Sequence, residues 1–404
     1  MAHHPDDNRI TYIARTNFRN ERKNFGIRRR DRRAHVYVIG KTGVGKSTLL
    51  ETMIRQDIIN GEGLALLDPH GDLVERVLAT LPARRRSDTI FFNVPDRAAS
   101  LGFNPLERVA PEKRALAASG LLEVFKKMWA DSWGPRLEHI LRNILLALLD
   151  QPEATLADVP RLLGDQAFRR RAALNVANRH VADFWLKEYE GYPPKFRAEA
   201  IAPIQNKVGA FLANPILSRI LTGGGIAGRS ANGGSNGSSF DLREVMDTGK
   251  ILLVNLAKGK IGEDTAALLG ALLVSRIGLT ALSRADVVEN NRRDFYLYLD
   301  EFPTFTTLSL ATMLSELRKY RLNLILAHQF LGQLDEQVRD AVLGNVGTII
   351  SFRLGPDDAE VFEKEFFPVF AAVDLMNLPN YNLYLKLMVD GAVTRAFSGE
   401  TLEC

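Results

Sequence analysis

The segment Gly40–Ser47 constrains the fold of this chain more than any other feature. It reads Gly-Lys-Thr-Gly-Val-Gly-Lys-Ser and matches the pattern G-x-x-x-x-G-K-S completely. Residues 35–40 form an apolar stretch typical of a short buried strand, and residues 46–59 follow with a helical pattern. A glycine-rich loop between a strand and a helix is the context in which this pattern holds phosphates. The segment therefore predicts an α/β fold with a phosphate site at the start of the helix.

Each part of this loop has a predicted role. The glycines let backbone N–H groups turn toward a β-phosphate, Lys46 brings positive charge to the β- and γ-phosphates, and Ser47 offers a hydroxyl to Mg²⁺. We expect nucleotide contacts from the whole loop and from the residue after it: Gly40, Lys41, Thr42, Gly43, Val44, Gly45, Lys46, Ser47 and Thr48.

A second strand supplies the acids that hydrolysis needs. Residues 295–299 are apolar and end at Asp300 and Glu301. At the end of a buried strand, Asp300 is expected beside the Mg²⁺ ion and Glu301 where it polarises an attacking water. A protein that only binds nucleotide does not need the second acid. The alternative is a strand that ends in a solvated acidic turn.

Two further strand ends carry polar residues. The apolar run before His328 and Gln329 predicts that Gln329 senses the γ-phosphate or orients water, with His328 in a structural role. Asp68 ends the strand 64–67, where ligands bind in open α/β sheets, and we expect it at the catalytic water or the outer shell of the metal. Asp72 fits the cap of the following helix equally well.

Ring-shaped P-loop motors commonly complete the site with an arginine from the neighbouring subunit. Arg353 is the preferred candidate because it ends a late strand, and Arg318 and Arg321 are the alternatives. Each of them fits an ordinary surface charge as well.

The organisation of the chain follows from its changes of pattern. Strands and helices alternate before about residue 106 and again after residue 240, as in a mainly parallel sheet with helices on both faces. Between them the pattern is helical, and residues 223–239 are rich in glycine and serine. The predicted parts are a basic N-terminal segment (1–34), the first part of the nucleotide-binding domain (35–106), an all-helical insert (107–222), a linker (223–239) and the second part of the nucleotide-binding domain (240–404).

Composition excludes several classes of protein. The only cysteine among 404 residues is Cys404, so disulfide frameworks and cysteine-based metal sites are excluded. The most apolar stretch, residues 265–282, is interrupted by Arg276 and predicts a buried core helix rather than a membrane span. Arginines crowd residues 19–33, where they either attract nucleic-acid phosphates or form a solvated surface.

These motifs together resemble the ATPases of conjugative DNA transfer and type IV secretion, the coupling proteins of the TraG/TraD type, and their HerA and FtsK relatives. The matching features are the P-loop, Asp68-Pro69-His70-Gly71-Asp72, residues 103–106 (Phe-Asn-Pro-Leu), the insert and the ends of two strands (Leu-Asp-Glu and Leu-Ala-His-Gln). The resemblance spans residues 35–404. It implies a RecA-like core, an all-alpha insert that contacts the DNA-processing complex, and a homo-hexameric ring that hydrolyses ATP with Mg²⁺ while it moves DNA.

The resemblance has one departure, because typical coupling proteins carry N-terminal membrane helices and this sequence shows none. We therefore expect a cytoplasmic ATPase that reaches the inner membrane through partners, such as relaxosome or secretion-channel proteins. The DNA that we expect it to bind is single- or double-stranded. Two alternatives stay open: a nucleotide-switched module that recruits substrates, and a secretion ATPase that translocates protein.

Overall fold

The computed structural model describes residues 6–18, 21–96, 101–222 and 238–402, and it divides into two compact units. The first contains residues 1–93, 242–260 and 280–404, and the second contains residues 94–241 and 261–279. The expected linker 223–239 lies outside the described residues, apart from its last two. The expected domain borders differ from these units, because residues 94–106 and most of the long helix α15 (Glu263–Ser283) belong to the second unit.

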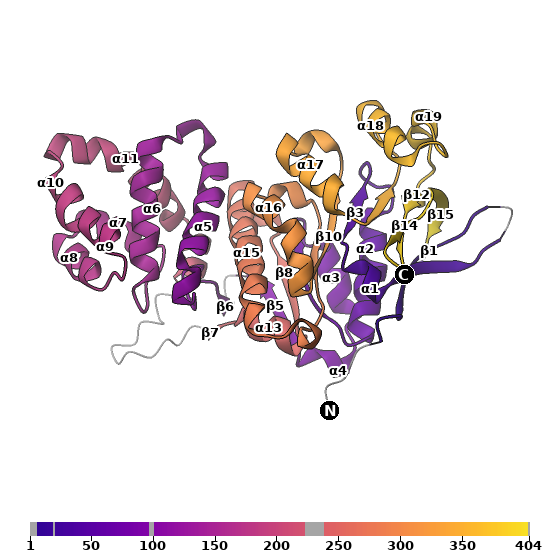
Figure 1. The fold of residues 1–404 in the computed structure, drawn as a ribbon, viewed down its shortest axis with the longest axis horizontal. Helices are drawn as coiled ribbons and strands as arrows, with labels where there is room; N and C mark the ends of the chain where they lie inside the picture. Colours follow the sequence, from indigo (N-terminus) through magenta and orange to yellow (C-terminus); the bar gives the residue numbers. More distant parts are fainter. Residues whose placement is uncertain (1–5, 19–20, 97–100, 223–237, 403–404) are drawn as a thin grey trace. The chain divides into compact units, whose positions relative to one another are not determined.

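An eleven-stranded sheet forms the centre of the first unit (Figure 1). Its order is β2-β1-β15-β12-β11-β3-β10-β9-β4-β8-β5, and the neighbours from β11 to β5 are parallel. The strands are β1 (Ile10–Arg15), β2 (Asn24–Arg28), β3 (Val36–Ile39), β4 (Gly63–Asp68), β5 (Thr89–Asn93), β8 (Ile251–Asn255), β9 (Phe295–Leu299), β10 (Leu322–His328), β11 (Thr348–Ser351), β12 (Asn382–Lys386) and β15 (Phe397–Thr401).

Helices and short hairpins surround this sheet. They are α1 (Arg29–Arg32), α2 (Lys46–Ile59), α3 (Asp72–Ala79), α4 (Ala83–Arg86), α13 (Leu242–Thr248), α14 (Lys258–Ile261), α16 (Leu308–Leu317), α17 (Glu336–Asn345), α18 (Pro356–Phe366) and α19 (Ala372–Met376). The turn Asp390-Gly391 joins β13 (Met388–Val389) to β14 (Ala392–Val393).

The central strands are buried on both faces, which explains their continuous apolar sequence. Helices α2 and α3 pack their apolar residues, such as Leu50 and Val74, against one face. On the other face, Tyr37 contacts the rings of Phe302 and Phe362. Burial from both sides fixes the strand ends, and the functional residues follow directly from those ends.

Two arginines of the basic cluster before the P-loop are buried, which corrects the expectation that the whole cluster is exposed. Arg29 and Arg32 are 3% and 2% exposed. Arg32 donates to both oxygens of Asp57 (2.6 and 2.8 Å), and Arg29 lies 2.8 Å from a Glu62 oxygen and 3.2 Å from Asp294. Buried cations require such partners because an unpaired charge away from water is costly. These side chains join the N-terminal segment to the sheet.

The second unit is mainly helical. Its helices are α5 (Arg114–Met128), α6 (Pro135–Leu149), α7 (Asp158–Gly164), α8 (Gln166–Leu174), α9 (Arg179–Asp183), α10 (Tyr189–Gly191), α11 (Pro194–Ala213) and α12 (Pro215–Leu221), with the short strands β6 (Leu101–Gly102) and β7 (Ser238–Ser239). The predicted apolar stripe of α6 is buried: Leu137, Ile140, Leu141, Ile144, Leu145 and Leu148. Residues 263–286 are long and apolar enough to cross a membrane, but 89% of their most apolar window is buried inside the protein. Such burial is typical of a core helix.

Candidate nucleotide site

The P-loop connects β3 to α2 and is fixed by its neighbours. Lys41 N–H donates to the Arg353 carbonyl (3.0 Å), which ties the loop to the end of β11. Gly45 has φ +120°, and a Cβ there would lie 3.0 Å from the Tyr381 ring and 3.2 Å from the Phe352 ring. Any other residue at position 45 would be strained and crowded. The backbone conformation and the close neighbours of this position therefore explain why the motif requires glycine here.

Lys46 lies inside this loop and is buried, since only 6% of the residue is exposed. Its Nζ donates to the carbonyls of Gly40 (2.6 Å) and Lys41 (3.0 Å). Burial lowers the pKa of Lys46, and the charges of Glu301 and Asp300 oppose this effect. The lysine is therefore held between the loop and the two acids.

Asp300 and Glu301 follow β9 and are 5% and 8% exposed. Burial raises the pKa of Asp300 to about 7; the nearby charges of Asp68 and Glu301 add to the rise, and Lys46 opposes it. Among the described residues no lysine or arginine forms an ion pair with Asp300. A buried carboxylate without an ion-pair partner is stabilised in its charged form by a nearby cation. Asp300 therefore fits the predicted Mg²⁺ site, in which the Ser47 hydroxyl is the other protein ligand. Magnesium takes few protein ligands when phosphates supply the rest.

Glu301 and Gln329 meet at the edge of the sheet. Gln329 Nε2 donates to Glu301 Oε1 at 2.9 Å, which joins the ends of β10 and β9. Glu301 has φ +50° and ψ +49°, a left-handed conformation that costs a non-glycine residue about 1 kcal/mol. The neighbouring structure holds this conformation and directs the carboxylate toward Gln329.

A third residue, which the sequence analysis missed, holds Gln329 in place. Gln333 Oε1 accepts hydrogen bonds from the backbone N–H groups of Gln329 (3.1 Å) and Phe330 (3.2 Å). It also lies 3.2 Å from His328 Nδ1, while the other ring nitrogen of His328 contacts the Tyr37 hydroxyl at 2.6 Å. Burial lowers the pKa of His328 to about 3, so the ring is neutral and structural. The only sequence signal for Gln333 is its position four residues after Gln329.

Asp68 has a structural role that the sequence analysis did not predict. Its Oδ1 accepts from His70 N–H (2.8 Å), and its Oδ2 accepts from Leu73 N–H (2.9 Å) and Val74 N–H (3.1 Å). The carboxylate thus satisfies the free N–H groups at the start of α3, the role expected for Asp72. Oδ1 accepts one hydrogen bond and Oδ2 accepts two, and the negative charge of Asp68 contributes to the raised pKa of Asp300.

The guanidinium of Arg353 donates hydrogen bonds within its own chain. Its Nη2 donates to Asn380 Oδ1 (2.9 Å) and its Nη1 donates to the Leu378 carbonyl (3.3 Å). These bonds brace the segment that ends at Tyr381, rather than extending the guanidinium away from the protein. The alternatives, Arg318 and Arg321, precede β10 and therefore lie at the opposite edge of the sheet from the P-loop.

Tyr381 is a second residue that the sequence analysis missed. Its N–H donates to the Val44 carbonyl of the P-loop at 2.7 Å, and its carbonyl accepts from Thr401 N–H at 2.8 Å. It has φ +66° and is 50% exposed. An exposed aromatic ring thus lies on the phosphate loop in a conformation that tyrosine rarely adopts.

Comparisons with known proteins agree with this geometry. Residues 29–132 match the family model of the central domain of the helicase HerA, and residues 294–364 match the model named the TraM recognition site of TraD and TraG. The first match contains the P-loop, and the second contains Asp300, Glu301, Gln329 and Arg353. Two parts of the chain are therefore similar to proteins of the HerA and the TraG/TraD type. The predicted resemblance is confirmed.

Solved structures share the fold of this chain. The bacterial conjugative coupling protein TrwB is 16% identical with a TM-score of 0.61, over 94% of this chain and 87% of TrwB. VirB4 of Thermoanaerobacter pseudethanolicus is 14% identical with a TM-score of 0.65, over 99% of this chain and 98% of VirB4. No curated protein matches the chain. The predicted RecA-like α/β fold class is confirmed.

Proposed function

We propose that this ATPase is a motor that hydrolyses ATP with Mg²⁺ to translocate DNA, as the coupling ATPase of a conjugative or type IV secretion system. The observation that carries the proposal is the contact between Gln329 and Glu301 beside Lys46. A module that only switches shape on binding nucleotide has no need for a strained, buried glutamate bonded to a residue of the next strand.

The roles of the residues follow from their positions. The P-loop N–H groups and Lys46 bind the phosphates, and Ser47 and Asp300 hold Mg²⁺, which supplies charge neutralisation to the phosphates. Glu301 accepts a proton from the attacking water. Gln329 contacts the γ-phosphate, and loss of that phosphate moves Gln329 and the end of β10 that precedes it. Two solved TrwB structures contain ADP with Mg²⁺ and a non-hydrolysable ATP analogue, which supports these ligands here.

Tyr381 extends the site from the phosphates to the base. A nucleoside attached to phosphates at the P-loop lies beside that loop, and the exposed Tyr381 ring offers a face on which its base stacks. Arg353 holds this ring in place through Leu378 and Asn380. We also propose that Arg353 acts as an arginine finger at the site of a neighbouring subunit in the assembled protein.

The proposed assembly is a homo-hexamer that works in the cytoplasm and contacts the inner membrane through partner proteins. The match to the TraM recognition model supports partners from the relaxosome or the secretion channel. The helical second unit is the proposed surface for such a partner.

The test is ATP turnover by the full chain with and without DNA at low salt. We expect single- or double-stranded DNA to raise turnover, and Glu301→Gln to lose about 10²- to 10⁴-fold in turnover while it still binds ATP. Glu336→Gln, at an exposed position of α17, is the matched control. Stimulation by unfolded protein instead of DNA would favour a protein-translocating ATPase. Full turnover in Glu301→Gln would contradict the assignment of the base.

A further inference from the structure

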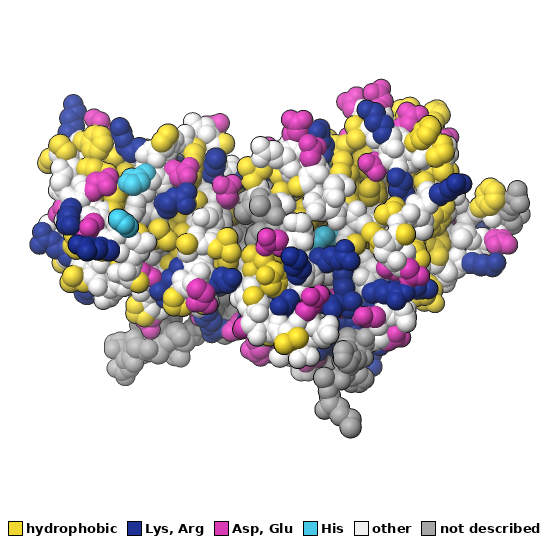
Figure 2. Space-filling model, viewed as in Figure 1, with side chains coloured by type: hydrophobic (Ala, Val, Ile, Leu, Met, Phe, Trp, Pro, Cys, Tyr) yellow, Lys and Arg dark blue, Asp and Glu magenta, His cyan; other side chains and the backbone are white. Residues whose placement is uncertain are grey.

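A cationic hollow lies at the amino edge of the same sheet, opposite the P-loop. It has a volume of about 560 Å³ and is lined by Arg30, Asp31, Arg33, Glu289, Ser315, Arg318, Lys319, Arg321, Asp390 and Gly391. Five of these residues carry positive charge and three carry negative charge. Lys and Arg side chains gather over this part of the first unit in Figure 2.

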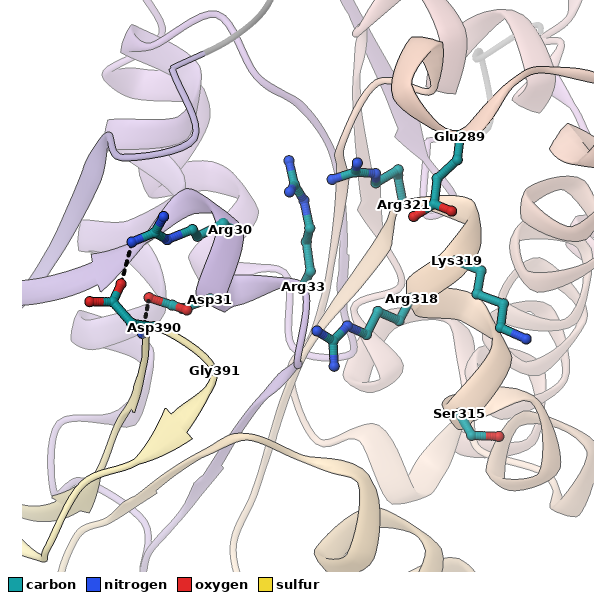
Figure 3. A pocket seen from close by; sticks show the side chains of 10 residues that line it. All are labelled: Arg30, Asp31, Arg33, Glu289, Ser315, Arg318, Lys319, Arg321, Asp390 and Gly391. Atoms are coloured by element: carbon teal, nitrogen blue, oxygen red, sulfur yellow. Dashed lines mark hydrogen bonds and ion pairs between the residues drawn. The ribbon is translucent and has the colours of Figure 1, made fainter.

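Two of the three negative charges in this hollow, those of Asp31 and Asp390, lie on one wall. Asp390 pairs with Arg28 and Arg30, and its N–H donates to Asp31 Oδ2. Arg33 pairs with Asp294 and Asp7. Figure 3 shows the pair of Arg30 and Asp390 on one side, with Arg318 and Arg321 projecting from the other side toward Arg33. Glu289 lies on the same wall as residues 318–321, where its single negative charge faces three cations, so this wall keeps a net positive charge.

The cations of this second wall have few partners. Arg318 and Lys319 are exposed, and no hydrogen bond or ion pair of their side chains is found within the described residues. Arg321 approaches Asp294 only to 4.0 Å, and its Nε and Nη1 are buried without a hydrogen-bond partner. Buried Nε atoms without a partner also occur at ten other described arginines, so those of Arg321 do not by themselves mark a ligand site. The donors that an anionic oxygen can reach from solvent are the exposed side chains of Arg318 and Lys319.

Phosphodiester oxygens fit these donors best. A guanidinium binds phosphate with two parallel N–H donors, and serine hydroxyls such as that of Ser315 also contact backbone phosphates. We propose that this hollow binds the phosphate backbone of the DNA that the motor moves. The proposal rests on the function proposed above and specifies where that DNA contacts the chain.

The position of the hollow links it to ATP. Residues 318–321 lead directly into β10, whose other end carries Gln329, and Arg33 precedes β3, whose other end is the P-loop. Both strands are buried, and seven residues of β10 span roughly 20 Å. A displacement of Gln329 after loss of the γ-phosphate therefore has a rigid path to the cations that hold DNA.

The test compares the wild-type chain with the double variant Arg318→Gln, Lys319→Gln. DNA affinity is measured against salt, and ATP turnover is measured with and without DNA. We expect affinity to fall by up to about tenfold per lost phosphate contact at roughly 0.1 M salt, and the salt slope to decrease by about 0.9 per contact. DNA stimulation should be lost in the double variant. Because Arg318 is also an alternative for the arginine finger, DNA-free turnover is compared in the single variant Lys319→Gln, where it should stay at the wild-type level. Lys364→Gln removes an exposed charge on α18, outside the hollow, and should behave as wild type.

Three results would overturn the proposal. Unchanged DNA affinity and salt slope in the double variant would remove the hollow from the DNA path and leave the proposed motor function intact. Loss of binding to a polyglutamate peptide, with DNA binding unchanged, would assign the hollow to an acidic protein segment. A wild-type chain that hydrolyses ATP but neither binds nor responds to DNA would contradict both this proposal and the DNA-translocating function.

Discussion

Replacing Tyr381 tests whether the exposed ring beside the P-loop binds the base of the nucleotide. The ring lies beside Gly45 and the residue is 50% exposed, so we expect a base to stack on one face of the ring only. A stack of a base on an aromatic ring contributes about 1–3 kcal/mol. Because only one face is available, we expect the lower part of this range, about 1–2 kcal/mol, or roughly 5- to 30-fold weaker ATP binding.

The assay is equilibrium binding of Mg·ATP and of inorganic tripolyphosphate to the same proteins. Tyr381→Gly removes the ring and tolerates φ +66°, so backbone strain does not confuse the result. We expect weaker binding of ATP, unchanged binding of tripolyphosphate, and near wild-type behaviour of Tyr381→Phe. Equal losses for both ligands, or ATP affinity within about twofold of the wild type, would refute the stacking role.

Three further predictions concern residues around the site. Gln333→Ala should lower ATP turnover by about 10-fold or more with ATP affinity retained, because the backbone N–H of Gln329 loses its acceptor. Gln337→Ala is the control, and equal turnover in the two variants would show that Gln333 is dispensable. Asp68→Ala should lower the free energy of unfolding by about 2–4 kcal/mol in urea titrations, because three N–H groups lose their acceptor; a loss below about 0.5 kcal/mol would contradict the capping role. Burial lowers the pKa of His35 to about 4, below its unfolded value, so stability should fall as pH decreases from about 6.5 toward 4, by about 2 kcal/mol at pH 5 for this residue. His35→Asn should flatten that part of the stability profile, and an unchanged profile would show that His35 is not its source.

The sequence predicted the parts of the site that depend on local order. The P-loop, Asp300, Glu301 and Gln329 each follow a buried strand, and parallel strands bring their carboxyl ends to one edge. Tertiary pairing decided the rest. Arg29 and Arg32 look exposed in sequence because their partners Glu62, Asp57 and Asp294 are distant along the chain.

Residues that act through backbone contacts were the hardest to predict. Asp68 follows a strand as a ligand does, but its oxygens turn to the N–H groups of α3. Tyr381 reaches the P-loop only because β15 and the P-loop both bind its backbone. Neither contact leaves a spacing pattern in the sequence, so both required the folded structure.

The divided second unit limits how this protein can be shortened. Because residues 261–279 belong to that unit, removing residues 94–241 alone would leave this segment, most of it in α15, without the rest of its unit. The retained segment contains Leu268, Leu269, Leu272 and Leu273, all fully buried in the intact chain. Exposed leucines in such a run favour aggregation. A soluble, isolated motor core therefore requires a redesigned α15 surface as well as the deletion.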